Sequence, residues 1–135
     1  MRVMLDTNVL ISAIVLKSKL MNEMLEIIIN NYKLVLSSYV INELKQVIAR
    51  KFKGKSENLD EFLTALPYEF VYTPDVIDKE LFEIRDEMDY PVLYTAIIED
   101  VDILITGDKD FAEVEVEKPE ILSPAEFIAN YSKSI

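Results

Sequence analysis

The chain lacks two side chains that support much of the catalysis at neutral pH and many tight metal sites. Among its 135 residues there is no cysteine and no histidine. The absence of cysteine excludes disulfides, thiolate metal sites and thiol nucleophiles. The absence of histidine removes the usual general base near pH 7 and the commonest zinc ligand. Any catalysis must therefore use carboxylates, hydroxyls, lysine, or a metal ion held by oxygen atoms.

Glycine and proline are also scarce, with two and five residues. Long flexible linkers are therefore not expected, and the length predicts one domain over residues 1–135. Half of the residues are hydrophobic, which is enough for a sizeable core. No apolar run approaches the ~20 residues of a membrane-spanning helix, and none follows a basic N-terminus as in a signal peptide. We therefore expect a cytoplasmic protein with no membrane partner.

The net charge of −11 argues against nucleic-acid binding, because phosphates attract lysine and arginine. The basic residues are not spread evenly, however. Residues 45–55, "KQVIARKFKGK", contain no acid and form what we call the basic segment. Its basic residues are Lys45, Arg50, Lys51, Lys53 and Lys55. The segment is either a solvated helix end, which the helix dipole favours, or a surface for backbone phosphates.

Short apolar runs alternate with helical patterns along most of the chain. The predicted strands are residues 2–6, 33–38, 69–73, 102–106 and 120–122. The predicted helices are residues 8–16, 19–32, 39–52, 56–66, 79–88, 89–101 and 123–131. The strands are nearly continuous apolar runs, which is typical of a parallel sheet covered by helices on both faces. Ligands of such sheets bind beyond the carboxyl ends of the strands.

Acidic residues follow two of the predicted strands. Asp6 comes directly after the first strand, and Asp108 and Asp110 follow Thr106 at the end of the "DILIT" strand. Each of these acids has an ordinary structural explanation, because aspartate is common at helix caps and in turns. For Asp6 a helix cap explains the residue equally well, and for "TGDKD" a plain turn is the simpler interpretation.

Two predicted helices add further acids. Glu43 lies at the edge of an apolar stripe, and Asp89 begins the buried stripe of its helix. Four acids on four elements would repel one another unless they bind a cation or take up protons. Oxygen ligands without histidine or cysteine favour Mg²⁺ or Mn²⁺.

The sequence resembles the PIN domain, a family of metal-dependent nucleases. The matching pieces are "MLDTNVLISAI", "LSSYVINELKQVI", "DYPVLYTAI", "DILITGDKDF" and the closing "ILSPAEFI". They occur in the family's order over nearly the whole chain, and the region from about 52 to 87 is the least marked. The resemblance implies a three-layer α/β/α sandwich with a central parallel sheet.

The resemblance also implies the roles of particular residues. The catalytic acidic quartet corresponds to Asp6, Glu43, Asp89 and Asp108, of which Asp6, Asp89 and Asp108 are the expected ligands of Mg²⁺ or Mn²⁺. Supporting positions correspond to Asn8 and Thr106, and Asp110 corresponds to a fifth acid often found near the fourth. The sequence leaves open whether Asp108 or Asp110 contacts the metal. The family's third motif often carries a second acid where this chain has Tyr90.

The implied function is that of a ribonuclease in which metal-activated water cleaves RNA. Small members of this kind are toxins of toxin–antitoxin pairs, so we expect an antitoxin protein as partner and a homodimer, and we assign RNA binding to the basic segment. One alternative is a non-catalytic PIN-fold module that binds RNA or protein. An aspartyl-phosphate phosphatase is less favoured, because such enzymes have an acid two residues after the nucleophile and position 8 is asparagine.

Overall fold

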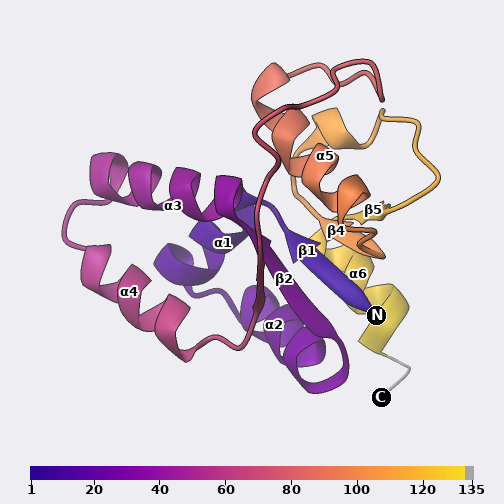
Figure 1. Ribbon diagram of the computed structural model, residues 1–135. Helices are drawn as coiled ribbons and strands as arrows, with labels where there is room; N and C mark the ends of the chain where they lie inside the picture. Colours follow the sequence, from indigo (N-terminus) through magenta and orange to yellow (C-terminus); the bar gives the residue numbers. More distant parts are fainter. Residues whose placement is uncertain (133–135) are drawn as a thin grey trace.

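Five parallel strands form a central sheet in the order β3-β2-β1-β4-β5, with helices on both faces (Figure 1). The structure is a computed structural model and describes residues 1–132, so the last three residues of the predicted domain lie outside it. The strands are β1 (Arg2–Leu5), β2 (Lys33–Ser37), β3 (Glu69–Val71), β4 (Ile103–Ile105) and β5 (Glu120–Leu122). The helices are α1 (Thr7–Ile11), α2 (Lys19–Asn31), α3 (Ser38–Lys51), α4 (Ser56–Ala65), α5 (Tyr90–Ile98) and α6 (Pro124–Tyr131). The predicted three-layer α/β/α fold is confirmed.

The burial of the strands matches their order in the sheet. The central strands β1, β2 and β4 are buried on both faces, apart from their first residues at the amino ends of β1 and β2. Such apolar strands are stable only where helices cover both sides of the sheet. The chain leaves β1 toward β2 and β3 in one direction and later returns to β4 and β5 in the other. The carboxyl ends of β1 and β4 therefore flank the topological switch point, where ligands of such sheets bind.

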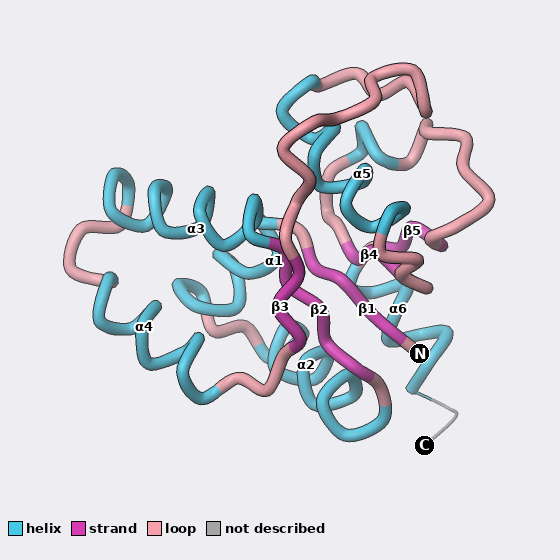
Figure 2. Tube along the Cα trace, in the orientation of Figure 1, coloured by secondary structure: helices cyan, strands magenta, loops and turns pink. Residues whose placement is uncertain are grey.

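The helices cover the two faces unequally. Right-handed crossovers place α1 to α4 on one face and α5 on the other, and α6 packs against α2 (Figures 1 and 2). The predicted first helix is only partly regular, because α1 continues into a π-helical turn, η1 (Ser12–Leu16), that ends at Lys17 with φ 48°. Within residues 1–132, no helix combines the length and the apolar character that crossing a membrane requires.

The prediction of a helix over residues 79–88 is wrong. Between β3 and α5 the chain forms an irregular segment, the long connection (residues 72–86), followed by a 3₁₀ turn, η2 (Glu87–Asp89). Tyr90 explains this path, because its hydroxyl donates to the carbonyl of Asp78 and accepts from the N–H of Leu81. Phe82 stacks on the Tyr90 ring with centroids 4.1 Å apart. These contacts hold the connection in a path that a helix could not follow.

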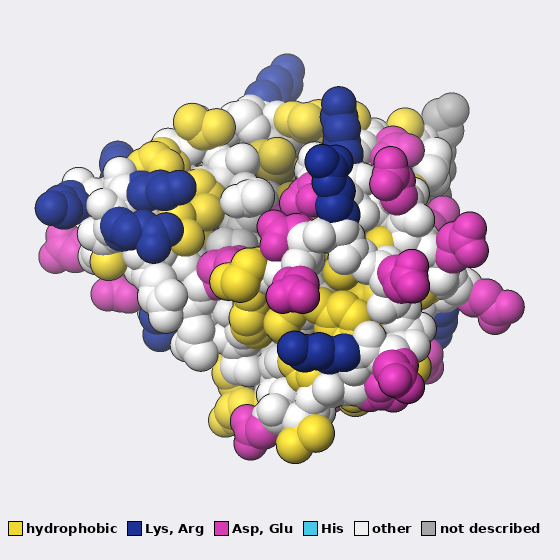
Figure 3. All heavy atoms as spheres, turned by 90° about the horizontal axis from the view of Figure 1, so that it is seen from above, with side chains coloured by type: hydrophobic (Ala, Val, Ile, Leu, Met, Phe, Trp, Pro, Cys, Tyr) yellow, Lys and Arg dark blue, Asp and Glu magenta, His cyan; other side chains and the backbone are white. Residues whose placement is uncertain are grey.

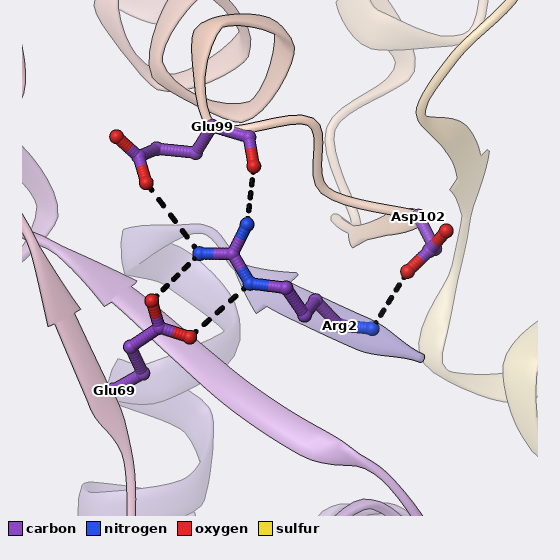
Figure 4. Close-up of polar contacts among 4 residues, drawn as sticks. All are labelled: Arg2, Glu69, Glu99 and Asp102. Carbon is purple, nitrogen blue, oxygen red and sulfur yellow. Dashed lines mark hydrogen bonds and ion pairs between the residues drawn. The ribbon is translucent and has the colours of Figure 1, made fainter.

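An ionic network joins the amino ends of the strands (Figure 4). The Arg2 guanidinium on β1 donates two hydrogen bonds to Glu69 on β3, at 3.1 and 2.8 Å, and one to the carbonyl of Glu99 after α5. The backbone N–H of Arg2 donates to Asp102 at 2.8 Å. The network therefore ties the edge strand and α5 to the centre of the sheet, at the end opposite the acids that follow the strands.

Candidate functional site

Asp6 connects the first strand to the fourth. It is only 5% exposed, and one carboxylate oxygen accepts a hydrogen bond of 3.1 Å from the N–H of Val9, so it caps α1. The other oxygen accepts a hydrogen bond from the hydroxyl of Thr106, directly after β4. The same hydroxyl accepts from the N–H of Asp108 at 3.0 Å. Asp6 is therefore a helix cap, which is one of the explanations that the sequence left open. Through Thr106 it is also connected to the "TGDKD" turn.

The "TGDKD" turn has the expected turn geometry. Asp108 accepts a hydrogen bond of 2.9 Å from the N–H of Asp110 and so caps the 3₁₀ turn η3 (Lys109–Phe111). This explains why aspartate stands at position 108. It does not explain why Asp110 remains half-buried beside further acids.

Glu43 is held by a residue that we did not predict. The hydroxyl of the buried Thr7, in the first turn of α1, donates to a carboxylate oxygen of Glu43 on α3. Its position directly after Asp6 was the available signal, because it places the hydroxyl at the same rim. The predicted support from Asn8 takes another form: its side chain is exposed, and its backbone N–H favours the ionised form of Asp6.

Asp89 lies at the centre of a close group of acids. One carboxylate oxygen each from Asp86, Asp89 and Asp110 lies within 4.8 Å of the others. Within residues 1–132, Oδ2 of Asp89 is buried and accepts no hydrogen bond from an N–H or O–H donor. Of the expected metal ligands, this trio contains Asp89 together with Asp110, the acid that the sequence left open as an alternative to Asp108. Asp86 was missed, and its signal was the "DEMD" spacing, which returns a carboxylate to the same side after one 3₁₀ turn.

The charges of these acids shift one another's pKa values. Burial raises the pKa of Asp89 to about 7, followed by the charge of Asp108, a hydrogen bond to the Asp108 side chain that favours the protonated form of Asp89, and the charges of Asp86 and Asp6. Burial, followed by the charge of Asp108, also raises the pKa of Asp6, although hydrogen bonds from Thr106 and Val9 oppose the shift.

Tyr39, at the start of α3, is influenced by the charges of the same group of acids. Burial and the charges of Glu43, Asp89 and Asp86 raise the pKa of its phenol. Six acids thus share one region, which we call the carboxylate cluster. Its members are Asp6, Glu43, Asp86, Asp89, Asp108 and Asp110.

The cluster suits a hard divalent cation. All its ligand atoms are oxygens, three of them lie close together, and a buried oxygen of Asp89 accepts no hydrogen bond from an N–H or O–H donor. Like charges at this separation resist joint ionisation, and a cation would offset their repulsion. One positive group already lies beside them, since the exposed Arg85 is 3.9 Å from Asp110. The arrangement can therefore hold a divalent cation.

The basic segment lies apart from the carboxylate cluster. Arg50 and Lys51 are in the last turn of α3, and Lys53 lies in the turn that leads to α4. In Figure 3 acidic side chains lie from the middle of the face to its right side, and a group of basic side chains lies at its left end, over the α3–α4 connection. Within residues 1–132, none of the five basic residues forms an ion pair.

Comparison with known proteins agrees with this architecture. A family model of the PIN domain matches residues 2–110. No curated protein matches the chain. Among solved structures, the chain is similar to one chain of the crystal structure of VapBC2 from Rickettsia felis bound to a DNA fragment from their promoter. The TM-score is 0.72 at 25% sequence identity, and the match covers 91% of this chain and 98% of that one.

Proposed function

Since the chain belongs to the PIN-domain family, whose members are generally nucleases, we propose that it is a divalent-metal-dependent ribonuclease and the toxin of a toxin–antitoxin pair. The observation that carries this proposal is the carboxylate cluster. Its acids come from the ends of β1 and β4, from α3 and from the residues before α5, and they meet at the switch point of the sheet. A purely structural role would not require a buried oxygen at Asp89 that accepts no hydrogen bond from an N–H or O–H donor.

Asp89 belongs to both sets of residues that could bind the metal. The family pattern adds Asp6 and Asp108, whereas the group of oxygens within 4.8 Å of one another adds Asp86 and Asp110. The two sets predict different losses of affinity. If Asp86→Asn weakens Mn²⁺ binding and Asp108→Asn does not, the second set holds the ion, and the reverse result supports the family pattern.

The chain's own residues provide the remaining chemistry. When bound, a divalent cation neutralises phosphate charge and lowers the pKa of a coordinated water. Glu43, fixed by Thr7, accepts a proton from the attacking water. The water oxygen bonds to phosphorus while the bond from phosphorus to the 3′ oxygen breaks. The 3′ oxygen takes a proton from solvent, which leaves a 3′-hydroxyl and a 5′-phosphate.

Substitution of the acids tests the activity. Asp6→Asn, Glu43→Gln and Asp89→Asn should each lower cleavage of a short RNA with Mn²⁺ by roughly 10²-fold or more. Glu26→Gln, an exposed acid on α2 outside the cluster, is the matched control and should cleave like the wild type. Full activity of Asp89→Asn would rule out the site assignment. Absence of activity in the wild type on every RNA tried would favour a non-catalytic binding module.

The basic segment is the proposed contact for backbone phosphates. Changing Arg50, Lys51, Lys53 and Lys55 to glutamine should weaken binding of RNAs of different sequence about equally, because phosphate contacts do not read bases. If all four touch single-stranded phosphates, the slope of log K against log salt should fall by up to ~2.8, at ~0.7 per contact. An unchanged slope would identify the segment as a solvated helix end.

An antitoxin is the proposed protein partner, and the solved neighbour is itself a VapBC2 complex bound to promoter DNA. Exposed apolar residues on the first helices, Leu16 at 71% and Leu20 at 42% exposure, offer a surface for it. Co-expression with a neighbouring small gene should give an inactive complex. Recovery of free, active protein would count against the toxin role alone. The proposed homodimer is tested by light scattering of the purified chain.

The phosphatase alternative is weakened by the surroundings of Asp6. Both of its oxygens accept hydrogen bonds, and the side chain is 5% exposed. A nucleophile that must attack a phosphate needs better access. Trapping of a covalent phosphoryl-aspartate would nevertheless restore this alternative.

A further inference from the structure

Two aromatic side chains on the edge strand are exposed to solvent. Phe70, in β3, is 42% exposed and Tyr72, directly after β3, is 76% exposed. Their rings form a T-shaped pair with centroids 4.8 Å apart and an interplanar angle of 86°. In a T-shaped pair one ring touches its neighbour with its edge, so that neighbour covers neither face of this ring. We call Phe70 and Tyr72 the aromatic pair.

The backbone next to Tyr72 is fixed at the rim of the carboxylate cluster. The N–H of Thr73 donates to the hydroxyl of Ser38 at 2.9 Å, and the hydroxyls of Thr73 and Thr95 share a hydrogen bond of 2.8 Å. Ser38 begins α3, which carries Glu43, and Thr95 lies on α5, which follows Asp89. Tyr72 is therefore anchored between the two helices that position these acids, while its ring remains in solvent. Figure 2 shows β3 leading directly into the long connection at this edge of the sheet.

The charges on α3 indicate what kind of molecule would contact both the basic segment and the aromatic pair. The carboxylate cluster lies near the first turns of α3, and the basic segment covers the second half of the same helix and the turn after it. Among residues 1–132, its basic side chains form no ion pair. A polyanion can contact the basic segment with its phosphates, but it needs an uncharged group to contact the aromatic pair. Unpaired nucleobases are such groups, because each has an apolar π-face that stacks on an aromatic ring.

We propose that the aromatic pair is a stacking platform for unpaired bases of the bound RNA. This inference rests on the proposed ribonuclease function. Paired bases of a duplex are already stacked within the helix and cannot lie on the rings. An added strand from a protein partner fits the edge less well, because β3 has three residues and offers few backbone groups.

Fluorescent RNA tests the platform without cleavage. A 12-nucleotide single-stranded RNA with 2-aminopurine at successive positions is mixed with the wild type in EDTA, and stacking on a ring should quench the probe at one or two positions. Tyr72→Ala should abolish this quenching and weaken binding about 5- to 150-fold, which corresponds to the loss of one stacked base. Tyr72→Phe keeps the ring and should restore both. Val76→Ala, an 85% exposed apolar residue on the long connection, is the control and should behave like the wild type.

Cleavage of the same RNA with Mn²⁺ separates this proposal from the proposed function. Tyr72→Ala and Phe70→Ala should raise KM while kcat changes little, and duplex RNA should be a poor substrate for the wild type. If the wild type cleaves and Tyr72→Ala retains its quenching and KM, the platform is refuted and the ribonuclease stands. If Tyr72→Ala retains RNA binding but loses a co-expressed protein partner, the pair is a protein contact and the proposal is overturned. If the wild type neither binds nor cleaves RNA, both proposals fail.

Discussion

Asp89 shows how one buried oxygen atom connects stability with function. In the folded chain without metal, burial and the neighbouring carboxylates raise its pKa from an ordinary value near 3.8 to about 7. The folded state therefore holds this proton more tightly than the unfolded state between these two pH values. This contribution to the free energy of unfolding is fully present below about pH 4, and it is lost as the pH rises through 7.

The prediction at this residue concerns the pH dependence of stability. In EDTA, the difference in free energy of unfolding between wild type and Asp89→Asn should move in favour of the variant as the pH rises from 4 to 7.5, because asparagine does not ionise. Urea unfolding at several pH values measures this difference. Glu26→Gln, an exposed acid, should track the wild type at every pH. A difference that stays constant across this range would contradict the raised pKa.

At the scale of an element, the long connection decides where Asp86 lies. Two of its backbone groups bond to the hydroxyl of Tyr90, its Phe82 ring stacks on the Tyr90 ring, and the hydroxyl of Tyr39 donates to the carbonyl of Met88 at 2.8 Å. Side chains of α3 and α5 thus replace the missing helical hydrogen bonds. An acid of the cluster depends on these contacts, so loosening them should affect the site.

Tyr90→Phe tests this dependence, because it removes the hydroxyl and keeps the stacked ring. We expect a loss of about 1–2 kcal/mol in the free energy of unfolding, from two hydrogen bonds. Amide hydrogen exchange should accelerate in residues 78–86, and Mn²⁺ affinity should fall with Asp86 less well placed. Tyr94→Phe, one turn along α5, is the control and should leave the exchange of this segment unchanged. Unaltered exchange in Tyr90→Phe would mean that the stacking contacts alone hold the connection.

At the scale of the whole molecule, the two ends of the sheet have opposite effects on stability. The carboxyl ends gather acids that repel one another, whereas the amino ends are joined by the network around Arg2. Mn²⁺ should raise the melting temperature, because it binds only the folded cluster, and a concentration of 100 Kd adds about 2.7 kcal/mol. Calorimetry with and without Mn²⁺ measures the shift, which Asp89→Asn should largely abolish. A wild type that shows no shift would argue against a metal site.

Arg2→Lys tests the network at the amino ends of the strands. Lysine cannot donate the two parallel bonds to Glu69, so we expect a loss of about 1–2 kcal/mol in the free energy of unfolding, measured with urea. The kcat for RNA should be unchanged because the network is remote from the acids. Lys118→Gln is the control, since this exposed lysine pairs with Asp100 and Asp102 at the surface, where solvent screens the charges and such pairs contribute little to stability. Equal losses in both variants would show that the Arg2 network is only a surface contact.

The sequence by itself determined the layers of this protein and the candidate acids. Short continuous apolar runs that alternate with helical patterns are typical of a covered parallel sheet, and Asp6 and Asp108 follow two such runs, so their place at one rim could be predicted from local pattern. Serine caps and an apolar stripe likewise marked α3 and α6 before any contact was known. Such features depend on neighbours a few residues away.

The tertiary structure alone decided which groups meet across long separations. Thr7 reaches Glu43 over 36 residues and Thr106 reaches Asp6 over 100, and no local pattern encodes either pair. The helix predicted over residues 79–88 did not form, because contacts with Tyr90 outweighed a weak local preference and brought Asp86 to the cluster. Local sequence sets which conformations a segment can adopt at low cost. The choice among them, and with it the composition of the site, depends on free energy from distant partners that only the folded chain brings together.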